Sequence, residues 1–324
     1  MNNAIIIEQN GGPEVLQYRE APMPTIGASE VLIRHTHIGL NFIDTYMRTG
    51  LYPVPMPFIL GAEAAGVIEE VGANVASFAV GDRVCYTSGF GAYQTYRALD
   101  TANLIKIPDG INNEIAAACL LKGMTAQYLL RQTFVVGAEH SIFFHAAAGG
   151  TGLIFGQWAK HLGAHLIGTA GSDGKCELAR KNGFKEVLNY KTQNFVKEAI
   201  RLNGGNKYDV VYDGVGKDTF DRSLDILKTR GLLVSFGQSS GKVPPFDITM
   251  LNMKGALFIT RPSLNHYNLT REALLANSKE LFGLIEKGII KIEIGQRYAL
   301  KDMRAAHEAL EGRKTIGATI IDVG

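Results

Sequence analysis

The chain has 324 residues, with 33 lysines and arginines against 31 aspartates and glutamates. This length exceeds what one hydrophobic core usually sustains, so we expect two domains. The net charge of +2 gives no general attraction to nucleic acid or anionic lipid, and we expect neither as a partner.

We expect no targeting segment, and the sequence contains no paired cysteine motif. Its start, MNNAIIIEQNGG, lacks the basic and long apolar regions of a secretory signal peptide. Cys85, Cys119 and Cys176 are far apart, which favours free thiols in a reducing compartment. The apolar run 142–159 is long enough to span a membrane, but its glycines divide it into a strand and a helix. We therefore expect a cytoplasmic protein.

The predicted elements change in character along the chain. Short β-like runs, separated by glycine and proline, come first, at residues 4–9, 30–39 and 64–72. From residue 140 onward, apolar strands alternate with helices. The predicted strands are 140–146, 165–170, 186–190, 208–216, 232–238 and 255–260, and the predicted helices are 149–164, 175–183, 192–205 and 218–231. This alternation predicts a doubly wound parallel sheet that binds a dinucleotide.

A glycine-rich turn follows the first of these strands. The letters AAGGTG place Ala147, Gly149 and Gly152 at the three glycine positions of the dinucleotide fingerprint. Gly149 lets the backbone approach a pyrophosphate, and Gly152 lets the helix pack on the strand. Ala147 departs from the usual first glycine, and its methyl group is tolerated if the turn keeps a negative φ there.

The end of the second strand of the alternation predicts which dinucleotide binds. NAD sites usually have an acidic residue there, but residues 169–170 are Thr and Ala. This leaves room for a 2′-phosphate, to which Ser172 can donate a hydrogen bond and Lys175 can supply a charge. Tyr190 can add a hydroxyl. Asp173 would serve NAD if the loop were shifted, but the missing acid favours NADPH.

Several stretches resemble one enzyme family. The segment 137–160, GAEHSIFFHAAAGGTGLIFGQWAK, resembles the quinone oxidoreductase and zeta-crystallin signature of the medium-chain dehydrogenase/reductase superfamily. Other stretches along the whole chain are similar to bacterial NADPH:quinone reductases: GGPEVLQYRE, IGLNFIDTYMRTGLYP, GAEAAGVIEEVG, GDRVCY, VSFGQSSG, TRPSL and LKDMRAAHEALEGR. The resemblance implies NADPH-dependent reduction of a small-molecule quinone by hydride transfer.

The resemblance also implies an α/β architecture of two domains. A GroES-like, β-rich catalytic domain would comprise residues 1–125 and 264–324, and a Rossmann domain would comprise residues 126–263. The cleft between them is expected to hold the nicotinamide and the substrate. The last strand of the cofactor domain, 255–260, would be an apolar sheet edge, and in the resembling enzymes it pairs with its own copy. We therefore expect a homodimer.

The residues at the zinc positions of this superfamily argue against classical zinc-dependent alcohol dehydrogenation. Zinc-dependent alcohol dehydrogenases bind their catalytic zinc through Cys, His and Cys, whereas this chain has Asn41, Ala62 and Lys122 there. An amide, a methyl and an ammonium group cannot form the tetrahedral site that zinc prefers. His35 and His37 share one face of a predicted strand and have no third ligand nearby, so we interpret them as strand residues. We expect no metal.

The resemblance assigns residues to the expected cleft. Asn41, Tyr46 and Tyr52 are predicted catalytic residues, which would hydrogen-bond the cofactor amide or a substrate oxygen. A purely structural role in a turn-rich loop is the alternative. The predicted cofactor-binding residues are Lys122, Thr125, Ala148, Gly149, Gly150, Thr151, Gly152, Gly171, Ser172, Lys175, Tyr190, Gly214, Phe236, Gly237, Ser239, Asn252, Arg261 and Arg313.

Two other functions stay open at this point. One is NADPH-dependent reduction of the double bond of an enone or alkenal, with Tyr46 or Tyr52 as the acid. The other is an NADPH-loaded binding protein, like the relatives recruited as lens crystallins or RNA-binding proteins. The near-neutral charge argues against RNA.

Overall fold

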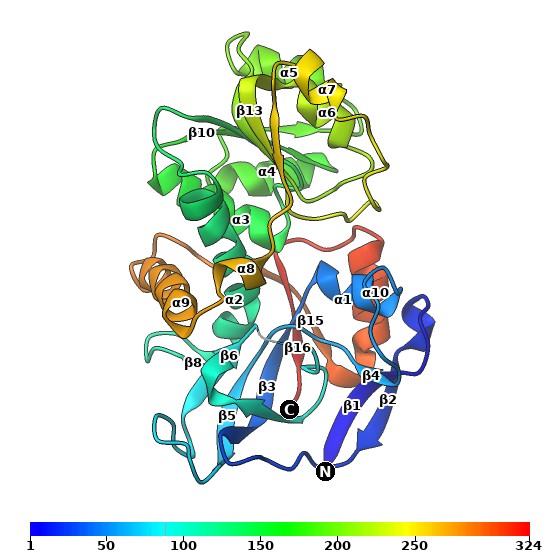
Figure 1. Ribbon diagram of the computed structural model, residues 1–324, viewed down its shortest axis with the longest axis vertical. Helices are drawn as coiled ribbons and strands as arrows, with labels where there is room; N and C mark the ends of the chain where they lie inside the picture. Colours follow the sequence, from blue (N-terminus) through cyan, green and yellow to red (C-terminus); the bar gives the residue numbers. More distant parts are fainter. Residues whose placement is uncertain (88) are drawn as a thin grey trace. The chain divides into compact units, whose positions relative to one another are not determined.

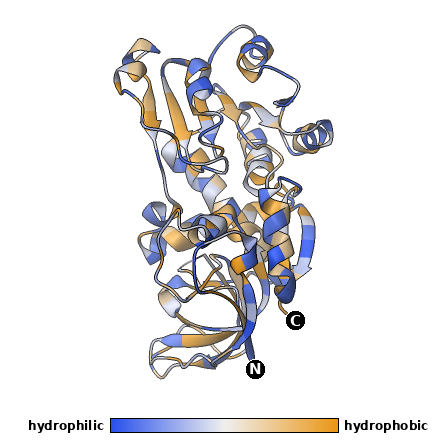
Figure 2. Cartoon of the chain, turned by 90° about the vertical axis from the view of Figure 1, so that its right-hand side faces the viewer, coloured by the Kyte–Doolittle hydropathy of each residue, from blue (hydrophilic) through white to orange (hydrophobic). Residues whose placement is uncertain are grey.

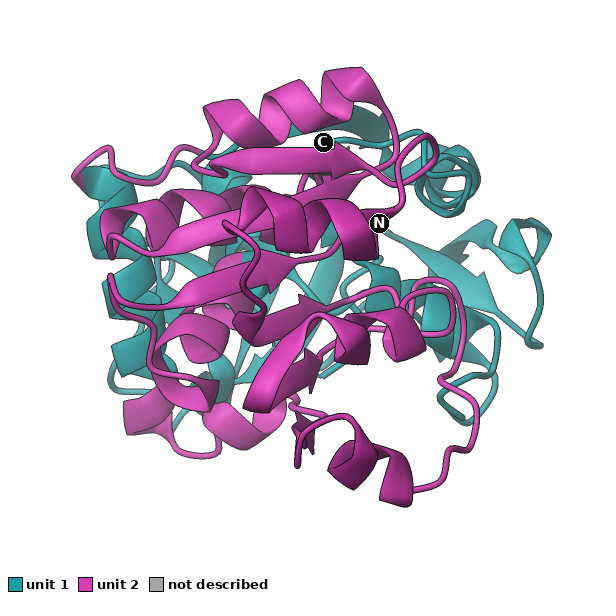
Figure 3. Ribbon diagram, turned by 90° about the horizontal axis from the view of Figure 1, so that it is seen from above, with its two compact units in different colours: residues 1–122, 274–286, 292–324 teal, residues 123–273, 287–291 magenta. Residues whose placement is uncertain are grey.

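The computed structural model describes residues 1–87 and 89–324. Two compact units make up the chain, and Figure 3 colours them separately. Unit 1 comprises Met1–Lys122, Leu274–Glu286 and Ile292–Gly324, and unit 2 comprises Gly123–Ala273 and Lys287–Lys291. Within the described residues, no helix is long and apolar enough to cross a membrane.

Unit 1 is built mainly from antiparallel strands (Figure 1). A three-stranded sheet has the order β2-β1-β4, and a seven-stranded sheet has the order β15-β16-β3-β5-β6-β8, with β7 paired to β3. The strands are β1 (Asn2–Ile7), β2 (Gln17–Ala21), β3 (Glu30–Leu40), β4 (Phe58–Ile59), β5 (Ala64–Val71), β6 (Arg83–Tyr86), β7 (Tyr96–Asp100), β8 (Ile105–Lys106), β15 (Ile294–Ala299) and β16 (Ala318–Asp322).

Few helices accompany these strands. They are α1 (Phe42–Arg48), α10 (Met303–Glu311) and the short 3-10 helices η1 (Pro13–Val15), η2 (Thr101–Asn103) and η4 (Leu300–Asp302). Helix α2 (Asn113–Tyr128) begins in unit 1 and ends in unit 2, and α9 (Arg271–Glu286) does the reverse. This β-rich texture confirms the predicted GroES-like domain.

Unit 2 contains the predicted parallel sheet. Its six strands have the order β11-β10-β9-β12-β13-β14. They are β9 (Ser141–Phe144), β10 (His165–Ala170), β11 (Glu186–Asn189), β12 (Tyr208–Asp213), β13 (Leu227–Ser235) and β14 (Phe258–Thr260), and each neighbouring pair is parallel. The doubly wound fold is therefore confirmed.

Helices connect these strands. They are α3 (Gly150–His161), α4 (Asp173–Lys181), α5 (Phe195–Leu202), α6 (Phe220–Asp225), α7 (Thr249–Met253) and α8 (Leu264–Tyr267), with a π-helix at Leu129–Thr133. One prediction was wrong: the expected helix 218–231 ends at Asp225, and the chain enters β13 at Leu227.

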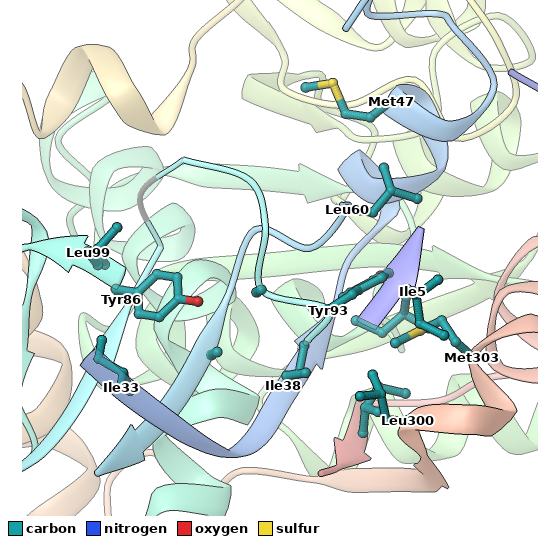
Figure 4. Packing of buried hydrophobic residues seen from close by; sticks show 14 of the residues in the cluster. Ile5, Ile33, Ile38, Met47, Leu60, Tyr86, Tyr93, Leu99, Leu300 and Met303 are labelled. Carbon is teal, nitrogen blue, oxygen red and sulfur yellow. The ribbon is translucent and has the colours of Figure 1, made fainter. Parts of the chain in front are cut away.

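Each unit has its own hydrophobic core. In unit 1, Ile5, Tyr93 and Met303 belong to one buried cluster, although they are far apart in sequence (Figure 4). In unit 2, every residue of β9 is buried, as expected for a central strand covered on both faces. Figure 2 shows the same pattern, with hydrophobic colour along the strands and hydrophilic colour on outward helix faces.

Candidate functional site

The carboxyl ends of the parallel strands in unit 2 gather most of the predicted cofactor residues. The strand order reverses between β9 and β12, which are neighbours in the sheet. Ligands of such sheets bind outside the carboxyl ends of the strands at this switch point. The predicted residues in the turns after the strands are Ala148 and Gly149 after β9, Gly171 and Ser172 after β10, Tyr190 after β11, Gly214 after β12, and Phe236 and Gly237 after β13.

The glycine-rich turn after β9 has an open side and a packed side. A Cβ atom on Gly152 would lie 2.5 Å from the Ala147 carbonyl oxygen, so the helix approaches the turn too closely for any side chain. A Cβ atom on Gly149 would meet only the Ala146 oxygen, at 3.3 Å. The left-handed residue of the turn is Ala146, with φ 59°, and Ala147 is not strained. The turn thus has the two properties expected of a pyrophosphate-binding loop.

Helix α3 begins directly behind this turn. Its N-cap is Gly149, which offers no side chain to the first backbone amides, and Gly150 and Thr151 form the first turn of the helix. Amides at a helix N-terminus without a side-chain partner, together with the helix dipole, favour an anion.

The ribose end of the expected site lies after β10. Thr169 is buried, and its hydroxyl is 3.0 Å from Nδ1 of His145. Ser172 is the N-cap of α4, where its hydroxyl oxygen accepts from the Lys175 amide at 3.4 Å. That bond leaves the Ser172 hydroxyl hydrogen available to an oxygen of a ligand. The only acid nearby in sequence, Asp173, accepts from Nδ2 of Asn189 at 2.8 Å.

Tyr190 closes this corner of the site. Its backbone amide donates to the Ala170 carbonyl at 3.1 Å. Its hydroxyl oxygen lies beside Gly171, where an added Cβ would stand 2.6 Å away. Its side chain is partly exposed. The hydroxyl therefore lies next to Gly171, and the role of Tyr190 in cofactor binding stays a prediction.

The ends of β12 and β13 meet closely. A Cβ atom on Gly214 would lie 3.0 Å from the Phe236 ring, and one on Gly237 would lie 2.6 Å from the Gly214 carbonyl oxygen. Ser239 donates its amide to the same carbonyl at 3.2 Å, and Arg261 donates from Nη1 to the Ser235 carbonyl at 2.7 Å.

The remaining cofactor candidates are more scattered. Thr125 is buried in α2, whereas Asn252 is exposed on α7. Arg313 belongs to unit 1, follows α10 and is exposed, with φ 56°. The cofactor roles of Asn252 and Arg313 stay predictions.

The catalytic candidates lie on and beside the short helix α1 of unit 1. Asn41 is the N-cap of α1, Tyr46 lies within it and Tyr52 follows it. The rings of Tyr46 and Tyr52 meet edge to face with centroids 5.5 Å apart, and the Tyr52 amide donates to the Tyr46 carbonyl at 3.1 Å. The structure thus brings the three predicted residues together in one segment.

A buried carboxylate, which the sequence did not single out, organises this site. Glu63 is fully buried, and its Oε2 atom accepts from Nδ2 of Asn41 at 2.8 Å and from Nζ of Lys122 at 2.9 Å. Its Oε1 atom accepts from the Leu121 amide at 2.7 Å. The second amide hydrogen of Asn41 goes to the Gly39 carbonyl at 3.1 Å. Because both acceptors fix Nδ2, the orientation of the Asn41 amide is determined.

A second buried carboxylate, Asp44, lies in the first turn of α1, three residues after Asn41. Oδ2 of Asp44 accepts from the Asn41 amide at 2.9 Å and from the Tyr93 hydroxyl at 2.8 Å. Burial raises the pKa of Asp44 to about 7, although both hydrogen bonds oppose this shift. Asn41 and Asp44 form a capping box at the start of α1, which is a local signal, but the Tyr93 partner of Asp44 and the Lys122 partner of Glu63 lie far away along the chain.

The side chains at the zinc positions do not fit a metal. Asn41 and Lys122 both donate to Glu63, and Ala62 has only a methyl group. The Lys122 ammonium has only hydrogens to present and the Ala62 methyl has no ligand atom, so the single amide oxygen of Asn41 cannot form a tetrahedral zinc site. Within residues 1–87 and 89–324, no group of three or more His, Cys, Asp or Glu side chains is arranged to hold a metal ion.

The strand histidines are engaged in unit 1. Tyr86 donates its hydroxyl hydrogen to Nε2 of His35 at 2.8 Å, and Nδ1 of His35 donates to the Gln94 carbonyl at 2.7 Å. Burial lowers the pKa of His35 to about 4, so the ring is neutral. His37 is half-buried on the same strand, with Nδ1 3.1 Å from the Thr36 hydroxyl.

Two family models match the chain. Residues 27–109 match the alcohol dehydrogenase GroES-like domain, and residues 150–274 match a model described as zinc-binding dehydrogenase. The second description names zinc, but the residues at the zinc positions of this chain lack the required donors, as shown above.

Several proteins are similar to this chain over nearly its whole length. A quinone oxidoreductase of Pseudomonas aeruginosa is 51% identical over 96% of this chain and 96% of its own length. A 2-haloacrylate reductase of Burkholderia sp is 41% identical over 98% of both chains. The crystal structure of Escherichia coli quinone oxidoreductase complexed with NADPH is 47% identical, with a TM-score of 0.97 over 99% of this chain and 100% of that chain.

Proposed function

Because this chain belongs to the quinone oxidoreductase family of the medium-chain dehydrogenase/reductase superfamily, we propose that it reduces quinones with NADPH. One observation carries this proposal: the similarity to an NADPH-bound quinone oxidoreductase extends over the full chain at a TM-score of 0.97. The open turn at Gly149 and the absence of an acid after β10 point to the same cofactor.

The residues of unit 2 fit NADPH. The first amides of α3 at Gly150 and Thr151 would hold the pyrophosphate, and Ser172, Lys175 and Tyr190 would hold the 2′-phosphate. When bound, the nicotinamide supplies the hydride. Phe236 would provide an apolar surface that excludes water.

The residues of unit 1 would orient the acceptor. The amide of Asn41 is fixed by Glu63 and Gly39, so its oxygen has a defined direction in which to accept a hydrogen bond. The hydroxyls of Tyr46 and Tyr52 would hydrogen-bond a quinone oxygen. A reduced quinone carries its charge on oxygens that solvent can protonate, so alignment and exclusion of water suffice. We propose that the reaction proceeds without zinc.

Steady-state oxidation of NADPH and NADH tests this proposal. Para- and ortho-quinones, enones and 2-haloacrylate would be the acceptors, with a chelator present throughout. We expect NADPH-selective turnover of quinones that is insensitive to the chelator. Turnover of activated alkenes alone would make the chain an alkene reductase, as its similarity to the Burkholderia reductase would then suggest. Tight NADPH binding without any turnover would indicate a binding protein.

Three finer assignments are proposals of the same kind. We propose a homodimer formed through β14, which is the last strand in the sheet order. A cytoplasmic location is supported by three buried free cysteines, which suit a reducing compartment. We also retain residues 126–263 as the cofactor domain and residues 1–125 with 264–324 as the catalytic domain.

A further inference from the structure

Helix α1 carries two fully buried charged residues on one face. Asp44 and Arg48 are four residues apart, so their side chains leave the helix on the same side. Tyr93 and His307, from distant parts of unit 1, link the two side chains.

The contacts form a continuous chain. Nη1 of Arg48 is 2.9 Å from Nδ1 of His307, Nε2 of His307 is 3.1 Å from the Tyr93 hydroxyl, and that hydroxyl is 2.8 Å from Oδ2 of Asp44. All four side chains have no solvent exposure. Arg48 is anchored further by Glu311, at 2.7 Å, and by the Gly11 carbonyl, at 3.1 Å.

The chemistry of these groups fixes the direction of every bond. A guanidinium group only donates, so Nδ1 of His307 must accept and the ring hydrogen must lie on Nε2. Nε2 then donates to the Tyr93 oxygen, which leaves the Tyr93 hydrogen for Asp44. The chain of donors therefore runs from Arg48 through His307 and Tyr93 back to Asp44, at the other end of the same helix.

We propose that Tyr93 and His307 are positioning residues that lock both ends of α1 and thereby hold Asn41 in its reactive orientation. Asp44 transmits the restraint, because the same Oδ2 atom that receives the Tyr93 hydrogen also receives the Asn41 amide hydrogen. This inference rests on the proposed function, in which Asn41 contacts the cofactor or the quinone.

This series of hydrogen bonds makes the site sensitive to pH. Burial raises the pKa of Asp44 to about 7, the Asn41 amide and the Tyr93 hydroxyl lower it, and of the neighbouring charges Lys122 lowers it and Glu63 raises it. Protonation of Asp44 weakens its hold on both hydrogens. Activity should therefore decline on the acid side of neutrality, and loss of the Tyr93 hydrogen bond should move this decline to higher pH.

Tyr93→Phe is the decisive variant. We expect the acid limb of kcat/KM for NADPH to move upward by about one pH unit, which is about a tenfold loss of activity at a pH on that limb. Tyr208→Phe is the matched control, because Tyr208 is also buried and donates to a backbone carbonyl in unit 2 at 2.7 Å. The control should lose stability without moving the limb.

Two substitutions of His307 test the direction of the hydrogen bonds that run from Arg48 to Tyr93. A glutamine side chain can accept from Arg48 through its oxygen and donate to Tyr93 through its nitrogen, whereas leucine can do neither. We expect kcat/KM of His307→Leu to fall about tenfold or more and His307→Gln to restore most of this loss. Equal losses in both variants would contradict the proposal.

An NMR measurement of the imidazole nitrogens tests the direction of these hydrogen bonds independently of turnover. The histidine signal that disappears in His307→Gln should show a neutral ring with its hydrogen on Nε2 down to pH 5. A ring that titrates near pH 6.5, or that carries its hydrogen on Nδ1, would overturn the proposal. The proposal would also be overturned if the acid limb of kcat/KM of Tyr93→Phe lay at the same pH as that of the parent protein. If quinones are not turned over, the proposed function fails. The pH dependence of NADPH binding, measured by calorimetry, then takes the place of the kcat/KM profile.

Discussion

The ribose side of the predicted cofactor site has no acid at the end of β10, and the first base after it is Lys175. We predict that Lys175→Ala raises KM for NADPH about tenfold, because a charge-assisted hydrogen bond to the 2′-phosphate is lost. KM for NADH should not change, since NADH has no phosphate there. Steady-state kinetics with both cofactors measures the two values.

Lys181→Ala provides the control for this substitution. Lys181 lies on the same helix, α4, and pairs with Glu177 on the exposed surface at 2.8 Å. Its loss should leave both KM values unchanged. An equal rise for NADPH and NADH in Lys175→Ala would show that Lys175 supports the fold and not the phosphate.

Glu63 is the second residue whose substitution is informative. We predict that Glu63→Gln lowers the free energy of unfolding by about 3 to 5 kcal/mol, because the buried ammonium of Lys122 loses its counter-ion. The new NH2 group would also face at least one donor, either the Leu121 amide at the Oε1 position or Asn41 and Lys122 at the Oε2 position. Urea denaturation measures the change, and Glu177→Gln on the exposed surface is the control. A loss equal to that of the control would contradict the prediction.

His35 gives the fold a defined sensitivity to acid. Burial lowers its pKa to about 4 from the ordinary 6.5, so below pH 6.5 the unfolded chain binds a proton that the folded chain refuses. We predict that the free energy of unfolding falls as the pH drops from about 6.5 to about 4, with His35 contributing about 3 kcal/mol. His35→Gln should flatten this slope in urea titrations at several pH values, and the exposed His266→Gln should not.

At the scale of elements, the strand–helix alternation of unit 2 could be predicted because each apolar strand is bounded by polar or glycine residues. The exception is informative. Residues 226–230 read as a continuation of the helix, yet β13 begins at Leu227. Tyr208 pairs with Leu227, and both are buried in the same core, so tertiary packing decides the conformation there.

The candidate site was predictable to a similar degree. Residues of the cofactor turns could be assigned because they directly follow strands, where the fold itself places the ligand. The buried chain of α1 could not be predicted, because His307 lies 214 residues from Tyr93. Glu63 stood in a recognised motif, GAEAAG, but its role depends on Lys122, 59 residues away.

The turn that opens α3 permits a paired test of element packing. We predict that Gly152→Ala lowers the free energy of unfolding by about 1 to 3 kcal/mol, because its Cβ would lie 2.5 Å from the Ala147 carbonyl oxygen. Gly149→Ala has more room and should fold normally, but its methyl group would stand on the open side of the turn and weaken NADPH binding. Thermal unfolding and calorimetry separate the two effects. Equal behaviour of the two variants would contradict this division of roles.

For the whole molecule, similarity over the full chain and the chemistry of single positions must be read together. The family model for residues 150–274 carries zinc in its description, but the zinc positions of the superfamily lie outside that segment, at Asn41, Ala62 and Lys122. A match to a cofactor domain therefore says nothing about metal. The side chains at these three positions lack the donor set of a tetrahedral zinc site, which supports the proposal of a reaction without zinc.

The exposed edge of unit 2 bears on assembly. Strand β14 ends the sheet order, and the large apolar side chain of Phe258, at the start of this strand, is 56% exposed. An apolar sheet edge is usually covered, and pairing with a second copy of β14 would cover this one.

We predict that Phe258→Lys shifts the protein from dimer to monomer in sedimentation equilibrium, since two buried like charges would oppose association. Val80→Lys, at an equally exposed apolar position in unit 1, should leave the mass unchanged. A monomeric parent protein at all concentrations would refute the dimer, and a dimer that tolerates Phe258→Lys would place the interface on another surface.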